Sequence, residues 1–89
     1  EALYIIDIND LVSNAKIEGG IITIFMDNED EPRTYISNKN TGEITMILDP
    51  GAYELEIEAD GYELKIVKLV VSEFDADKGA IKKLFKLSK

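Results

Sequence analysis

The clearest pattern in the chain is an alternation of apolar and charged residues in its second half. From residue 53 to residue 58, apolar side chains occupy the odd positions and glutamates the even ones. Successive side chains of a strand point to opposite faces, so this period of two predicts a strand with one buried face. Asp49, Pro50 and Gly51 precede it, and proline followed by glycine favours a turn at this point.

A second turn is predicted at Asp60 and Gly61, a dipeptide that favours a two-residue hairpin loop. A loop of this length sets the register of the next strand. The predicted pairs are Ala59 with Tyr62, Ile57 with Leu64, Leu55 with Ile66, Glu56 with Lys65, and Glu58 with Glu63. The Glu56 pair is favourable and the Glu58 pair unfavourable. The apolar phase changes between Ile66 and Val67, which predicts a bulge or kink there.

Four further strands are predicted earlier in the chain. Residues 3–8 and 34–37 are short β-branched or aromatic runs, whereas the nearly continuous apolarity of residues 21–26 indicates burial on both faces or a central position in a sheet. Residues 43–48 place Ile44, Met46 and Leu48 on one face. The polar stretches between these runs, at 9–16, 27–32 and 38–42, are predicted to be connections.

The turn at residues 49–51 presents a conflict of phase. A tight hairpin through residues 48 and 52 would set Ile47 and Thr45 beside the inward side chains of the next strand, although the apolar residues before the turn are the even ones. The sequence leaves two alternatives open: a bulge at the turn, or an arch that carries the chain from one sheet to another.

The last ten residues fit two patterns. A helical stripe would contain Ile81, Leu84, Phe85 and Ser88, whereas a strand would place Ile81, Phe85 and Leu87 on one face. We favour the strand because the segment is short and follows six predicted strands.

The composition of the chain excludes several kinds of functional site. We interpret the 89 residues as one small domain, residues 1–89, and since the chain begins without an initiator methionine we expect it to be a fragment of a larger protein. Cysteine and histidine do not occur, which excludes disulfides, thiolate zinc sites, an imidazole base and a cysteine nucleophile. We therefore expect no enzymatic activity and no cofactor.

Charge is divided unequally along the chain. Residues 1–60 contain 14 acidic and 3 basic side chains, and residues 61–89 contain 4 and 7, which together give the net charge of −8. Such an acidic protein would repel a phosphate backbone, so nucleic acid is not an expected partner. The absence of an apolar run of about 18–20 residues argues against direct membrane insertion.

Four motifs, in this order, resemble carboxypeptidase regulatory-like domains: Asn-Ala-Lys-Ile at residues 14–17, Asn-Thr-Gly-Glu-Ile at 40–44, Leu-Asp-Pro-Gly-Ala-Tyr at 48–53 and Ala-Asp-Gly-Tyr at 59–62. PEGA domains share the last two motifs. The resemblance covers about residues 14–71, and the acidic stretch at 27–32 and Ile44, where an aromatic is usual, depart from it.

This resemblance implies an all-β fold: a seven-stranded, Greek-key, transthyretin-like β-sandwich. It also implies a non-catalytic accessory module, a structural spacer or protein–protein docking domain of an extracellular or cell-envelope protein. Its expected partners are other domains of the same chain or another protein. The alternative is a carbohydrate- or small-ligand-binding module that uses loops at one end of the sandwich.

The strongest candidate for a binding site is the acidic connection. Its carboxylates are hard oxygen ligands suited to calcium, although their spacing matches no calcium loop and a solvated acidic hairpin tip explains them more simply. The metal candidates are Asp27, Glu29, Asp30 and Glu31, with Asp49 expected nearby. The candidate ligand loop consists of Asp27, Asn28, Glu29, Asp30, Arg33 and Tyr35.

The sequence bears on three other kinds of site. A sugar platform would use Tyr4, Tyr35 and Phe74, for each of which packing in the core or rim is favoured. The C-terminal lysines Lys82, Lys83, Lys86 and Lys89 would bind an acidic partner or, more simply, form a solvated strand face. An autocatalytic isopeptide bond is disfavoured because the first strand has no lysine and the glutamates at 54–58 point outward.

Overall fold

A computed structural model describes residues 1–26 and 31–89. The described residues form seven strands and one short 3₁₀-helix. The strands are β1 (Ala2–Asp10), β2 (Ile21–Met26), β3 (Arg33–Ile36), β4 (Ile44–Leu48), β5 (Gly51–Glu58), β6 (Lys65–Val71) and β7 (Ala80–Leu87), and the 3₁₀-helix η1 is Asp75–Asp77. The predicted all-β class is confirmed, and so is the strand at the C-terminus.

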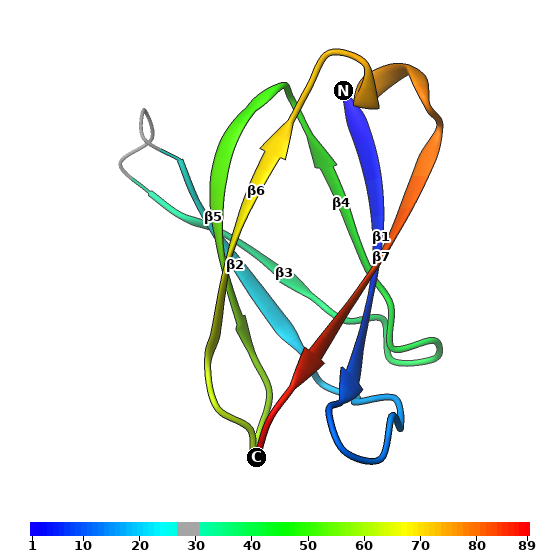
Figure 1. Cartoon of the computed structure of the whole chain (residues 1–89), viewed down its shortest axis with the longest axis vertical. Coiled ribbons are helices and arrows are strands. Elements are labelled where there is room, and N and C mark those ends of the chain that lie inside the picture. The colour runs from blue at the N-terminus through cyan, green and yellow to red at the C-terminus, as the bar shows by residue number, and fades with distance from the viewer. Residues whose placement is uncertain (27–30) are drawn as a thin grey trace.

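The strands form two sheets that face each other, as Figure 1 shows. One sheet has three strands in the order β4-β1-β7, and the other has four in the order β3-β2-β5-β6. β2 lies between β3 and β5, which confirms the central position that its apolarity indicated. Burial on both faces is not observed, because Ile22 and Ile24 are buried whereas Thr23 is only half-buried.

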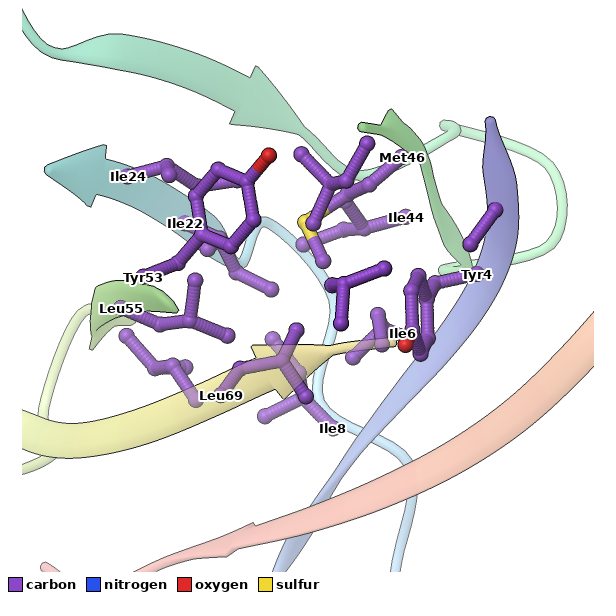
Figure 2. Close-up of a cluster of buried hydrophobic side chains, with 14 of the residues drawn as sticks. Tyr4, Ile6, Ile8, Ile22, Ile24, Ile44, Met46, Tyr53, Leu55 and Leu69 are labelled. Carbon is purple, nitrogen blue, oxygen red and sulfur yellow. The ribbon is translucent and has the colours of Figure 1, made fainter. Parts of the chain in front are cut away.

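The core fills the space between the two sheets. Side chains of β1 and β4 point toward side chains of β2, β5 and β6 (Figure 2). On β1 every even position is buried, from Ala2 to Asp10, and on β5 the buried residues are Tyr53, Leu55 and Ile57. The period of two in the sequence therefore reports a real division between inner and outer faces in both sheets.

The turn at residues 49–51 is an arch between the sheets. β4 pairs with β1 in the three-stranded sheet, and β5 pairs with β2 in the four-stranded sheet. The change of sheet removes the conflict of phase, because Ile44, Met46 and Leu48 and the odd residues of β5 approach the core from opposite sides. Of the two alternatives that the sequence left open, the arch between two sheets is thus confirmed.

The predicted register between β5 and β6 is wrong by one residue. Leu55 lies opposite Val67 instead of Ile66, and Glu56 lies opposite Ile66 instead of Lys65. A type I′ hairpin turn needs positive φ at both central residues, but only Gly61 has it, at +82°, and Asp60 does not. The backbone N–H of Tyr62 does bond to the Ala59 carbonyl, so a turn forms at the predicted place. The residue pairs between β5 and β6 do not begin at this turn, however, but at Ile57 and Lys65.

The new register also removes the predicted bulge after Ile66. β6 keeps one phase throughout, with Leu69 and Val71 buried and Val67 half-buried. Leu64 and Ile66, expected inside, are 51% and 56% exposed. Neither the Glu56–Lys65 pair nor the Glu58–Glu63 pair forms in this register, in which Glu54 instead lies opposite Lys68.

β1 and β7, the first and last strands, are parallel neighbours. Their register runs over eight residue pairs, from Leu3 opposite Ala80 to Asp10 opposite Leu87. The N-terminus and the C-terminus consequently lie at opposite ends of the molecule's longest axis (Figure 1). β1 is the inner strand of its sheet and is held by β4 on its other side.

Candidate functional site

Most of the candidate ligand loop lies outside the described residues, namely Asp27, Asn28, Glu29 and Asp30. Of the remaining candidates, Glu31 and Arg33 are exposed, and Arg33 begins β3 opposite Ile24. Tyr35 is half-buried, lies opposite Ile22 and packs against the core. The ring of Tyr35 is therefore engaged partly in packing, and its partners in the predicted loop are not placed.

The described residues contain no cluster of three or more acidic side chains arranged to hold a metal ion. Glu31 is the one member of the predicted metal set that the structure describes, and it is solvent-exposed. Asp49, expected near that loop, is also exposed, and its backbone carbonyl accepts a hydrogen bond from the Tyr53 hydroxyl. That bond fastens the arch between β4 and β5.

The three aromatic candidates occupy different environments. Tyr4 is 1% exposed and is a core residue, as expected. Phe74 was expected to pack in the core or rim, and this is wrong: its side chain is 78% exposed, in the connection just before η1. Since Tyr4 is buried and Tyr35 half-buried, the three rings do not form a shared exposed platform of the kind that binds sugars.

The four C-terminal lysines are all exposed, but they do not form one strand face. On β7, Lys82 and Lys86 lie beside Ile5 and Asn9 on the outer side of the sheet, whereas Lys83 lies beside Ile6, on the side toward the other sheet. Lys89 follows the strand, and its Nζ lies 3.9 Å from Oδ2 of Asp10.

Asp10 is the centre of the best-organised polar group among the described residues. Its Oδ1 accepts hydrogen bonds from the backbone N–H groups of Val12 and Ser13, at 2.8 and 3.0 Å. Its Oδ2 accepts a third from the Tyr62 hydroxyl, at 2.8 Å, and Lys89 lies over the Tyr62 ring. One carboxylate thus joins the end of β1, the β5–β6 connection and the C-terminus.

These hydrogen bonds stabilise the ionised form of Asp10. The Ser13 backbone N–H, the Tyr62 hydroxyl and the Val12 N–H lower the pKa of Asp10 from its ordinary 3.8 to about 2. Conversely, the bond to this carboxylate raises the pKa of Tyr62. The hydrogen bonds occupy both oxygens of Asp10, so the group fastens three segments of the chain to one another.

Asp10 was predicted to lie in a connection, which is wrong, and this polar group was not predicted. β1 in fact extends to Asp10, whose even number puts it in phase with Tyr4, Ile6 and Ile8 on the buried face. A charged residue at an inward position needs partners, and that phase was the available signal. The partner Tyr62 lies 52 residues away along the chain.

An open hollow of about 350 Å³ lies on the four-stranded sheet. Phe25, Ala52 and Val70 contribute apolar surface, and Glu54 and Lys68 contribute charge. These residues belong to the outward phase of β2, β5 and β6 and converge on no buried polar group. The hollow therefore has no feature that identifies a ligand.

No model of a known protein family matches the chain, and no curated protein matches it either. Within residues 1–26 and 31–89, no helix is long and apolar enough to cross a membrane.

Proposed function

We propose that this chain is a non-catalytic accessory β-sandwich that acts as a structural spacer, able to carry tension between the segments attached at its two ends. The observation that carries this proposal is the parallel pairing of β1 and β7 over eight residue pairs, with residues 1 and 89 at opposite ends of the long axis. The setting we propose is an envelope, secreted or surface protein whose other domains or protein partners flank it.

Parallel terminal strands resist tension through their geometry. Pulling residues 1 and 89 apart drives β1 and β7 along each other in opposite directions, so the evenly spaced hydrogen bonds between them bear the force together. β1 would also have to slide past β4, with which it shares five further residue pairs. Forced unfolding depends on the unfolding rate, and a barrier made of many bonds that break together keeps that rate low.

The finer fold belongs to the same proposal. We assign the sandwich to the Greek-key, transthyretin-like type that the motif resemblance implies. Two features support the assignment: β4 returns from the opposite sheet to lie antiparallel beside β1, as the fourth strand of a Greek key does, and the Pro50-Gly51 arch is followed by Tyr53, whose hydroxyl bonds to the arch.

Single-molecule pulling tests the spacer role. Handles at residues 1 and 89 load β1 and β7 in shear, whereas handles at residue 1 and a cysteine in place of exposed Lys78 pull at the same end of both strands and separate their bonds one by one. We expect a clearly higher unfolding force in the first geometry. Equal forces in the two geometries would remove the basis of the proposal.

The second candidate function is binding of carbohydrate or another small ligand by loops at one end. The hollow lined in part by Phe25 and Met26 supports this second candidate. A titration with calcium and with a panel of oligosaccharides, followed by amide NMR shifts, separates the two functions. Localised shifts at Glu31, Arg33 and Tyr35 would favour ligand binding, whereas an unchanged spectrum is the result that we expect of a spacer.

A further inference from the structure

β6 is the least protected edge among the described strands. It pairs with β5 on one side and with no described strand on the other. The outward-pointing N–H and C=O groups of such an edge are a template for another strand. Of the other edges, β3 has only four residues, and β4 has five and lies beside β3.

β7, the fourth edge strand, is protected differently. It has lysines at positions 82, 83 and 86, and charged side chains on an edge oppose strand addition by other chains. β6 has two lysines, Lys65 and Lys68, but it exposes Ile66 by 56% and Val70 by 72%. At the start of β6, Lys65 donates to the Lys86 carbonyl of β7, so the free part of the edge is residues 66–71. Apolar side chains on this free edge favour contact with a partner.

The charge around this edge indicates the kind of partner. Within the described residues, no carboxylate oxygen lies within 4 Å of Lys68 on β6 or of Lys83 on β7, although the protein has a net charge of −8. Lys83 belongs to the face of β7 that looks toward the sheet of β6. A strand added to β6 would therefore lie beside a lysine that makes no ion pair within the described residues, although the protein as a whole is acidic.

The strand that β6 already binds shows the matching pattern. β5 presents Tyr53, Leu55 and Ile57 to the core and glutamates to the outside, with Glu54 opposite Lys68. A second strand of this kind on the free edge would extend the inner apolar face beside Val67 and Leu69. It would also put carboxylates next to Lys68 on the outer face.

We propose that the free edge of β6 binds an extended peptide segment with apolar side chains on one face and carboxylates on the other, as an added strand of the four-stranded sheet. This deepens the docking role of an accessory module and does not depend on the shear geometry of β1 and β7. Backbone hydrogen bonds would supply affinity, and the lysines would select the acidic partner.

The test uses a synthetic peptide with the sequence of residues 52–59, Ala-Tyr-Glu-Leu-Glu-Ile-Glu-Ala, as the probe. Titrated into the isotope-labelled 89-residue chain, it is expected to shift the amides of β6 and to slow their hydrogen exchange. The same peptide with lysine in place of each glutamate, and one N-methylated at alternate residues, are expected not to bind. The first lacks the carboxylates and the second lacks backbone donors.

Two matched variants locate the contact. Lys68→Glu should weaken peptide binding about tenfold, because an attractive cross-strand pair becomes a repulsive one. Lys82→Glu makes the same change of charge on the outer face of the other sheet and should leave the affinity unchanged. Circular dichroism and thermal unfolding of both variants verify that they fold.

Four results would overturn the inference. The first two are absence of binding by the glutamate peptide and equal effects of the two variants on its affinity. The third is a shift of the Ile22 and Ile24 amides, which would show that the peptide replaces β5 instead of adding to β6. The fourth is self-association of Lys68→Glu without peptide binding, which would mean that Lys68 only protects the edge against aggregation. The pulling experiment remains independent: a low shear force with intact peptide binding would reject the spacer role alone.

Discussion

β1 and β6 are two apolar strands of similar length, but β1 is the inner strand of its sheet and β6 is an edge strand. β1 lies between two neighbours, and its even side chains are buried from one end to the other. β6 has one neighbour, and burial is confined to its later odd positions, Leu69 and Val71. An inner strand is constrained on both sides and so displays its pattern fully, whereas an edge strand retains apolar residues that the core does not need.

The largest expected contrast is between Ile6 and Ile66. Ile6→Ala removes a fully buried side chain from the inner strand and should lower the free energy of unfolding by about 2–5 kcal/mol. Ile66→Ala changes an exposed side chain and should stay within about 0.5 kcal/mol. Urea unfolding of both variants measures the difference, and equal losses would mean that β6 points its even residues inward, as the sequence first suggested.

The next expected effect is a loss of stability in acid, caused by protonation of Asp10 at the end of β1. The pKa of Asp10 is about 2 in the folded protein and about 3.8 when unfolded, so its contribution to stability is present above pH 3.8 and is lost as the pH falls toward 2. Asp10→Asn should destabilise the protein at pH 7 and flatten this part of the profile of melting temperature against pH. An unchanged profile in Asp10→Asn would show that other carboxylates govern the acid transition.

Tyr62→Phe provides the matched control for Asp10. It removes one of the three hydrogen bonds to the carboxylate and leaves the two from Val12 and Ser13. The pKa of Asp10, followed by carboxyl-carbon NMR, should rise in this variant but stay below its ordinary value. A pKa that did not move would place the Tyr62 hydroxyl outside the group.

A smaller effect than that of Ile6→Ala is expected at the arch between the sheets. Tyr53→Phe keeps the buried ring and removes the hydroxyl that donates to the Asp49 carbonyl, at a cost of about 0.5–1.5 kcal/mol. Chemical denaturation gives the value. A loss of several kcal/mol would indicate that the arch depends on this bond far more than the surrounding core packing suggests.

Local patterns predicted much of the fold. β2 begins and ends at the predicted residues, and the inward faces of β4 and β5 and the arch between them follow from the phases of their side chains. The register of β6 did not follow, because Asp60-Gly61 favours a type I′ turn while the structure gives Asp60 no positive φ. Turn propensity is a local preference, and the apolar residues of β6 on both faces did not constrain the pairing.

Long-range relations were beyond the sequence patterns. Nothing local indicates that β7 pairs in parallel with β1, some 77 residues earlier at Leu3 and Ala80, or that Asp10 meets Tyr62. The candidate ligand loop was identified from composition alone, and of its members only Arg33 and Tyr35 lie within the described part of the chain. The observed register, one residue away from the predicted one, is what leaves Ile66 exposed beside the free edge of β6.

Amide hydrogen exchange, resolved by residue under native conditions, tests the contrast between the two strands most directly. Over residues 3–6, β1 pairs with both β4 and β7, so its amides there should exchange only through global unfolding. Alternate amides of β6 should exchange much faster through its open edge. Uniform protection along β6, or early exchange throughout β1 and β7, would contradict the account of a closed terminal pair and an open edge at β6.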